Sequence, residues 1–109
     1  MGLELTDPAA GLLTSEAAEG VWLLQLSRPK VRNALSTALR DAVSAALDVL
    51  VETGDARAIV LTGAGEYFSA GFDLKEFAAA AEDPRVNAEL WASSDRFHHT
   101  VLRLSLIHI

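Results

Sequence analysis

The stretch that organises this chain is Ile59-Val60-Leu61-Thr62-Gly63-Ala64-Gly65-Glu66-Tyr67-Phe68-Ser69-Ala70-Gly71-Phe72-Asp73-Leu74-Lys75. An apolar run passes into a turn with three glycines, and the turn ends in a motif able to open a helix. Glycine permits positive φ or a close approach of the backbone to a ligand. A sharp turn between a strand and a helix leaves backbone N–H groups without partners, and such donors suit an oxyanion or a phosphate. Residues 59–75 are therefore the candidate site.

The segments before this turn predict the elements that hold it in place. Leu12–Thr14 and Val21–Leu26 are predicted to form a hairpin, and the second segment is apolar enough for a strand covered on both faces. Ser36 is a suitable N-cap for a helix over residues 37–53, and Gly54 is a suitable residue to end it. Residues 57–61 predict another buried strand. Strand, helix and strand at this spacing predict a crossover unit in an α/β fold with a partly parallel sheet.

Three helices are expected in all, and the charges of the last one, Glu89, Asp95, Arg96 and Arg103, are expected to face solvent. In the helix over 37–53 the apolar residues share one face, so Arg40 is predicted to point away from it. A short helix is predicted over 73–81, and Asp83-Pro84 predicts the start of a longer one that ends near residue 103. The predicted buried face of this last helix consists of Val86, Leu90, Phe97, Val101 and Leu104.

Composition limits the classes of function. The chain has 109 residues, half of them hydrophobic, which suits one domain or part of one. Its net charge of −6 argues against nucleic acid as the main partner. The absence of cysteine excludes disulfides and thiolate metal sites and is compatible with a cytoplasmic protein. No membrane span or secretory signal is expected, and no metal or redox cofactor is implied.

Other interpretations of the glycine turn fit less well. An ordinary turn remains possible on glycine spacing alone. A dinucleotide fingerprint fails because position 68 is Phe, and a nucleophile elbow at Ser69 fails because position 67 is Tyr. Asp73 suits the first turn of a helix, and Glu66 suits a solvated turn. Adjacent histidines at 98 and 99 point about 100° apart on a helix and do not favour chelation of a metal.

Three motifs, in the same order and at similar spacing, resemble the enoyl-CoA hydratase/isomerase (crotonase) family. They are Arg28–Ser36 (RPKVRNALS), Ile59–Gly63 (IVLTG) and Phe68–Lys75 (FSAGFDLK). The resemblance covers roughly residues 12–104. It implies the amino-terminal part of a crotonase-like (ClpP/crotonase) spiral of β-β-α units, an acyl-CoA thioester as the ligand, and coenzyme A only as part of the substrate. It also implies that the full-length protein is a homotrimer or a dimer of trimers.

The resemblance also implies roles for particular residues. In this family two backbone N–H groups stabilise the enolate or oxyanion at the thioester carbonyl, and the first corresponds to the N–H of Phe72. The adenine would lie near Ala70 and against Asn33, Ala34 and Leu35. The full set implied for CoA and acyl binding is Lys30, Arg32, Asn33, Ala34, Leu35, Ala70, Gly71, Phe72, Asp73, Leu74, Lys75, Phe77 and Trp91, in which the three cations would meet the CoA phosphates. Phe77 and Trp91, which lie at helical spacing, would pack in the core and expose one face to the acyl pocket.

The family pattern ends near Ser105. We expect residues 1–104 to represent the amino-terminal part of a crotonase-like domain and residues 105–109 to form a tail that departs from it. The second oxyanion turn and the catalytic carboxylates of the family would then lie outside the chain, which would be inactive in the hydration or isomerisation expected of the whole protein. The alternatives are a non-catalytic CoA-binding or scaffold protein and an unrelated nucleotide-binding α/β domain. An uncovered apolar sheet predicts poor solubility.

Overall fold

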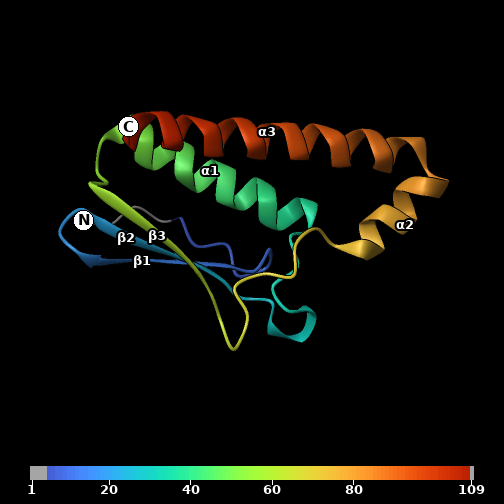
Figure 1. The fold of residues 1–109 in the computed structure, drawn as a ribbon, viewed down its shortest axis with the longest axis horizontal. Helices are drawn as coiled ribbons and strands as arrows, with labels where there is room; N and C mark the ends of the chain where they lie inside the picture. The colour runs from blue at the N-terminus through green and yellow to red at the C-terminus, as the bar shows by residue number, and fades with distance from the viewer. Residues whose placement is uncertain (1–4, 109) are drawn as a thin grey trace.

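The computed structural model describes residues 5–108, and their side chains as far as Leu102, in a mixed α/β arrangement (Figure 1). The elements in chain order are β1 (Leu12–Ala18), β2 (Val21–Leu26), the 3-10 turn η1 (Pro29–Val31), α1 (Thr37–Thr53), β3 (Ala58–Gly63), α2 (Leu74–Glu82) and α3 (Pro84–His108). Residues 1–4 and 109 lie outside the described residues. The first four belong to the predicted amino-terminal part, residues 1–104, and residue 109 belongs to the predicted tail, residues 105–109.

The three strands form one sheet in the order β1-β2-β3. β1 and β2 are the antiparallel strands of a hairpin, and β2 and β3 are parallel, with Leu26 paired with Gly63 at the end of the ladder. The predicted hairpin and crossover are therefore confirmed. Since the parallel strands end at the same edge, the two loops that follow them also begin there.

Helix α1 has the predicted bounds and the predicted caps. The Ser36 hydroxyl accepts from Leu39 N at 3.1 Å, and Gly54 ends the helix with φ of 70°. Its apolar face packs on β1 and β2 to make the hydrophobic core, which consists of Leu12, Trp22, Leu24, Leu26, Leu39, Val43, Ala46, Leu47 and Leu50.

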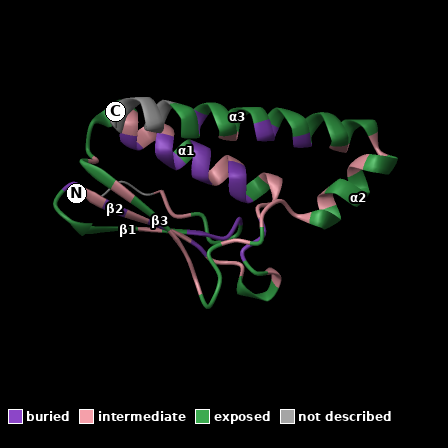
Figure 2. Ribbon diagram, viewed as in Figure 1, coloured by how far each residue is buried: buried purple, intermediate pink, exposed green. Residues whose placement is uncertain are grey.

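Three layers result, with α1 between the sheet and α3 (Figure 1). The sheet buries the face that meets α1 and leaves the other face more open (Figure 2). Along β2, buried Trp22, Leu24 and Leu26 alternate with half-buried residues. The prediction that this strand is covered on both faces is wrong, because the helices lie on one side of the sheet only.

The predicted burial of the third strand is also wrong. Strand β3 forms an edge of the described sheet, and Val60 and Leu61 are 47% and 38% exposed. An apolar sequence favours burial only where a neighbouring element exists to cover it. Within residues 5–108 no strand pairs with the outer edge of β3, so its side chains reach solvent.

Helices α2 and α3 begin near the predicted positions, but α3 continues to His108 instead of ending near residue 103. On its predicted buried face Leu90 is buried, whereas Val101 is 42% exposed; the residue buried on that turn is its neighbour Thr100. The Leu104 side chain lies outside the described residues. None of the helices in the described part of the chain is long and apolar enough to cross a membrane.

Candidate functional site

Two loops meet where β2 and β3 end. Residues 27–36 lead from β2 into α1, and residues 64–73 lead from β3 into α2. Ala64 N donates to Leu26 O at 2.8 Å, so the second loop remains attached to the sheet as it leaves the ladder. The first turn of α1 lies beside both loops. The geometry of the glycine turn therefore depends on contacts between two segments more than thirty residues apart in sequence.

Asn33 makes several of these contacts. Its side chain is fully buried, and its Nδ2 donates to Ala64 O and to Tyr67 O, each at 2.9 Å. Its Oδ1 accepts from Arg28 N at 2.7 Å. The residue has φ of 55°, a left-handed conformation that Asn tolerates better than most side chains. The Asn33 amide is thus fully used in joining the two loops and faces into the protein.

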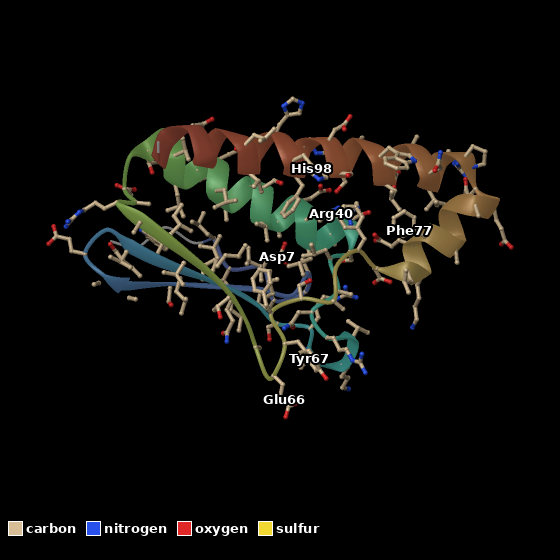
Figure 3. All side chains as sticks on the ribbon, viewed as in Figure 1. Asp7, Arg40, Glu66, Tyr67, Phe77 and His98 are labelled. Carbon is tan, nitrogen blue, oxygen red and sulfur yellow. The ribbon has the colours of Figure 1, made fainter. Side chains whose placement is uncertain are left out.

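The glycine turn is tightened by Ser69 and by a close backbone approach at Gly63. Ser69 Oγ donates to Asn33 O at 2.8 Å and accepts from Gly71 N at 3.0 Å. A Cβ placed on Gly63 would collide with the carbonyl oxygens of Tyr67 and Phe68, so only glycine fits at the end of β3. Glu66 points outward from the tip of the turn, as predicted for a solvated residue (Figure 3).

The Phe72 backbone is fixed by a parallel bridge to Leu35. Leu35 N donates to Gly71 O at 2.7 Å, and Asp73 N donates to Leu35 O at 3.3 Å. In a parallel bridge of this kind both hydrogen bonds belong to the residues that flank Phe72, so its own N–H and C=O face the opposite side. A Cβ placed on Gly71, which has φ of 95°, would meet nothing within 4 Å. The turn therefore presents a backbone donor next to open space.

An arginine and an aspartate hold the end of the turn. The guanidinium of Arg28 lies 3.4 Å from the Asp73 carboxylate and donates to Ala34 O at 2.6 Å. Asp73 Oδ1 also accepts from Lys75 N at 2.9 Å and so caps α2. Both groups are largely buried. The predicted helix-start role of Asp73 is confirmed, and the ion pair adds a link from the loop after β2 to the start of α2.

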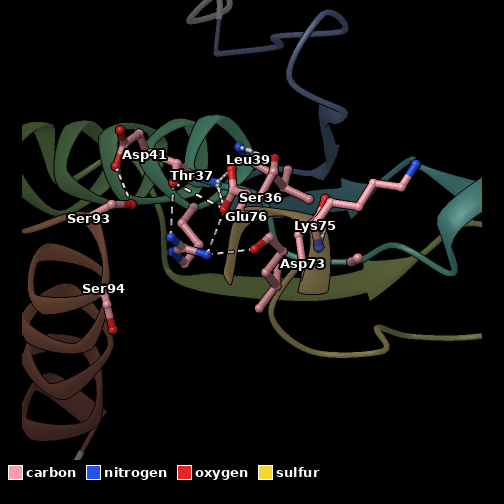
Figure 4. Close-up of polar contacts among 12 residues, drawn as sticks. Ser36, Thr37, Leu39, Asp41, Asp73, Lys75, Glu76, Ser93 and Ser94 are labelled. Atoms are coloured by element: carbon pink, nitrogen blue, oxygen red, sulfur yellow. Dashed lines mark hydrogen bonds and ion pairs between the residues drawn. The ribbon is translucent and has the colours of Figure 1, made fainter. Parts of the chain in front are cut away.

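A second pair of charges lies where α1 begins (Figures 3 and 4). Glu76 of α2 accepts from Thr37 N at 2.8 Å and from Thr37 Oγ1 at 3.1 Å, and its Oε1 lies 3.7 Å from Arg40 Nη1. The Arg40 side chain is 0% exposed, and burial lowers the pKa of its guanidinium. The prediction placed Arg40 off the apolar face of α1 and gave no sign of its burial, which comes from the contacts with Glu76 and the Phe72 ring.

The three cations proposed for phosphate contact are exposed on two elements. Lys30 lies on η1 and Arg32 follows it, with its guanidinium 5.3 Å from the centroid of the Tyr67 ring. Lys75 lies in the first turn of α2. None of these cations forms an ion pair with a carboxylate in the described part of the chain. Each is therefore free to meet an anion from solution.

The apolar residues predicted for the acyl pocket are more exposed than predicted. Phe77 is 40% exposed and stacks on the Phe72 ring, with 6.0 Å between centroids. Leu74 and Trp91 are 79% and 57% exposed, and the Trp91 indole donates to Asn87 on its own helix. The interpretation of Phe77 and Trp91 as core residues is wrong for this structure, since few other side chains of α2 and α3 cover them.

The remaining predicted residues surround the same bridge. Ala34 is buried, Leu35 and Gly71 are half-buried, and Ala70 is exposed with its N–H donating to Arg32 O at 2.9 Å. No three acidic, histidine or cysteine side chains gather into a possible metal site among the described residues. Sequence reasoning did not identify Arg40 or Glu76 as part of this region. Local patterns give no signal for them, because the contacts of Arg40 with Phe72 and Glu76, and of Glu76 with Thr37, join positions more than thirty apart.

The sheet, the crossover helix and the turn define an α/β protein of the strand–helix–strand type. The sequence profile of the enoyl-CoA hydratase/isomerase family matches residues 16–109, and the chain belongs to that family. A probable enoyl-CoA hydratase of Rhodobacter capsulatus is 48% identical over 64 residues, which cover 59% of this chain and 24% of the relative. The fold is that of the family's crystal structures: an enoyl-CoA hydratase of Mycobacterium smegmatis superposes with a TM-score of 0.76 and 36% identity, over 86% of this chain and 36% of that one.

A third relative carries a different kind of name. Small ribosomal subunit protein mS47 of Schizosaccharomyces pombe is 35% identical over 89 residues, which cover 79% of this chain and 20% of the relative. The chain spans about a fifth to a third of the length of the curated relatives that it matches. Family membership therefore establishes the fold and the kind of protein, and activity is a separate question.

Proposed function

We propose that the chain binds acyl-CoA thioesters and that the Phe72 N–H donates a hydrogen bond to the thioester carbonyl. The observation that carries this proposal is the parallel bridge, which directs that N–H away from Leu35, and the preceding Gly71 has nothing within 4 Å of its Cβ position. The free cations Lys30, Arg32 and Lys75 would meet the CoA phosphates. The exposed Phe77 would contact the acyl chain. Coenzyme A would enter as part of the substrate, with no separate cofactor.

The chemical role follows from how a backbone donor acts. When a proton leaves the carbon beside a thioester, or when water adds to the conjugated double bond, negative charge develops on the carbonyl oxygen. A fixed N–H stabilises that charge without reorganising, and losing one such donor commonly costs about 10²–10³ in rate. Hydration and double-bond isomerisation both pass through this enolate. We assign the donor to Phe72 and assign no acid or base within the chain.

The test replaces the Phe72 amide by an ester. Incorporating phenyllactic acid at position 72 removes the N–H and keeps the side chain. Calorimetry then compares butyryl-CoA with S-butyl-CoA, a thioether that lacks the carbonyl oxygen. We expect the chain to prefer the thioester about two- to tenfold, as one neutral hydrogen bond allows, and the ester variant to lose this preference.

Position 68 supplies a matched control. Phenyllactic acid at position 68 removes the N–H of that residue and keeps its side chain. It also weakens the Tyr67 carbonyl as an acceptor, and this carbonyl accepts from Asn33. The change at position 72 likewise weakens the Gly71 carbonyl, which accepts from Leu35. The position 68 variant should therefore keep the thioester preference. Equal binding of thioester and thioether by the unmodified chain would overturn the proposed donor.

A second candidate function is non-catalytic scaffolding in a larger assembly. The observation that favours it is the similarity to a protein named as a ribosomal subunit component. In that case the turn would be retained for the fold alone, and neither CoA nor its thioesters would bind. Calorimetry at millimolar CoA distinguishes the two, because a scaffold gives no heat of binding with either ligand.

A further inference from the structure

Arg40 lies directly behind the candidate oxyanion donor. Its side chain is 0% exposed, and its guanidinium carbon lies 4.3 Å from the centroid of the Phe72 ring. That distance is well inside the range of about 6 Å over which a cation attracts an aromatic face. Planar guanidinium groups also stack on rings, which fixes the ring in direction as well as in distance. The cation therefore restrains the Phe72 side chain from the α1 side.

Arg40 also holds the other member of the bridge. Its Nη1 donates to Leu35 O at 2.6 Å, and the same oxygen accepts from Asp73 N at 3.3 Å. Nη2 donates to Thr37 Oγ1 at 3.2 Å. One guanidinium thus contacts the Leu35 carbonyl on one side of the bridge and the Phe72 ring on the other. A change in its position would move both segments that orient the Phe72 N–H.

Stability alone is a weak explanation for this buried charge. Its nearest carboxylate, on Glu76, lies 3.7 Å away, and Arg40 Nε has no hydrogen-bond partner. Burying a charge with incomplete pairing is costly, and apolar residues of similar volume often stabilise a protein as well or better. What an apolar residue lacks is the combination of a directed bond to Leu35 O and a cationic face for the Phe72 ring.

We infer that Arg40 is a positioning residue, which sets the direction of the Phe72 N–H toward an acyl-CoA thioester carbonyl through the Phe72 ring and the Leu35 carbonyl. This inference rests on the proposed function for its ligand, but its geometric part stands by itself. The nearby charges are balanced, with Arg28 and Arg40 facing Asp73 and Glu76. Arg40 therefore acts by placing the donor and not by adding net charge to the site.

The first test measures geometry without any ligand. Residual dipolar couplings of the Phe72 N–H are recorded for the ¹⁵N-labelled full chain, at concentrations where light scattering shows a monomer. In Arg40→Met the Phe72 coupling should change while couplings within α1 and β2 stay the same. Phe72→Leu, which keeps Arg40 and removes only the ring, should show a similar change at position 72 and serves if Arg40→Met fails to fold. An unchanged coupling in the folded variant overturns the inference.

The control is Ser44→Ala. Ser44 is a buried polar residue of the same helix whose Oγ has no partner, and its removal should leave the Phe72 coupling unchanged. A similar change in this variant would show a general response of α1 to core substitution and would also overturn the inference. Arg40→Lys keeps the charge but loses the planar stacking face, so its coupling should lie between those of the wild type and Arg40→Met.

The second test measures binding and separates the two proposals. Arg40→Met should lower the preference for butyryl-CoA over S-butyl-CoA about two- to tenfold, the size of one hydrogen bond, with the affinity for S-butyl-CoA unchanged. The wild-type chain could bind butyryl-CoA and S-butyl-CoA equally while Arg40→Met still changes the Phe72 N–H coupling. That result would overturn the proposed function and leave the positioning role standing. A wild-type preference that survives Arg40→Met in full would overturn the positioning role alone.

Discussion

The two halves of the molecule are held together by different forces. The half formed by β1, β2 and α1 contains the main hydrophobic cluster of the described residues, in which nine apolar side chains are buried against one another. The half formed by α2 and α3 buries little. Helix α2 has no buried residue, and the buried side chains described on α3 are Leu90, Ser93, Ser94 and Thr100. Figure 2 shows the same contrast along the ribbon.

This difference shows how the candidate site is built. The glycine turn lies at the boundary between the halves and joins them through directed polar contacts: the Asn33 amide, the Arg28–Asp73 pair and the Glu76 carboxylate at Thr37. A hydrophobic core supplies most of the free energy of folding but sets no direction. Hydrogen bonds and ion pairs contribute less and define geometry. The following predictions alter one half or its attachment at a time.

The largest effect is expected in the core. Leu24 is fully buried, and Leu24→Ala should lower the free energy of unfolding by about 3–5 kcal/mol, from lost burial plus the cavity left behind. Leu102 on α3 is 61% exposed, and Leu102→Ala should change stability by less than about 0.5 kcal/mol. Urea unfolding measures both. Similar losses in the two variants would contradict the contrast between the halves.

A smaller loss is expected at the loop junction. Asn33→Asp keeps the acceptor for Arg28 N but faces the carbonyls of Ala64 and Tyr67 without a donor, so it should cost about 2–3 kcal/mol near neutral pH. The cost should shrink on acidification. A carboxyl buried there has its pKa raised above the unfolded value of about 4, so protonation relieves the folded state first. Urea unfolding at pH 7 and pH 4 checks this, and a pH-independent loss would refute it.

Substitutions at two glycines of the turn distinguish the effect of backbone strain on stability from an effect on ligand binding. Gly71 and Gly65 have φ of 95° and 79°, and a Cβ at either position meets nothing within 4 Å. Each alanine substitution should therefore lower stability by about 1–2 kcal/mol through backbone strain alone. Only Gly71→Ala alters the residue next to the Phe72 N–H, so only it should also reduce the thioester preference. Equal effects on binding in the two variants would argue against a local donor.

The smallest expected effect concerns the exposed cations. Arg32→Met should weaken the binding of CoA about two- to fivefold at low salt, as the loss of one solvated ion pair with phosphate allows, and the effect should fade as salt is added. Arg57 is also exposed but immediately precedes β3, at the opposite end of the sheet. Arg57→Met is therefore the control, and calorimetry at two salt concentrations distinguishes local contact from a change in net charge.

Much of the fold could be predicted because its signals are local. The Ser36 cap, the apolar face of residues 37–53 and Gly54 placed α1 correctly, and strand–helix–strand spacing predicted the parallel pairing of β2 and β3. The glycines between residues 63 and 71 predicted the turn that joins β3 to α2. In each case a few adjacent residues carry the physical reason, such as a side-chain cap or a run of apolar residues.

The errors share one cause, which is the absence of a local signal for tertiary partners. Arg40 is a charged residue at the edge of an apolar stripe, and only Phe72 and Glu76, far along the chain, show that it is buried. The exposure of Val60 and Trp91 likewise depends on which elements are present to cover them. The predicted poor solubility stays a prediction, and those exposed side chains are the surface that would cause it.

The contact between Glu76 and Thr37 has a consequence for the order of folding. The backbone donor at Leu39 is satisfied by its neighbour Ser36, whereas the donor at Thr37 is satisfied by a residue of a later helix, across the whole of β3 and the turn (Figure 4). The first turn of α1 is therefore complete only after α2 has docked. We therefore expect the middle of α1 to form early with the hairpin, and its amino end to be completed later, when α2 docks.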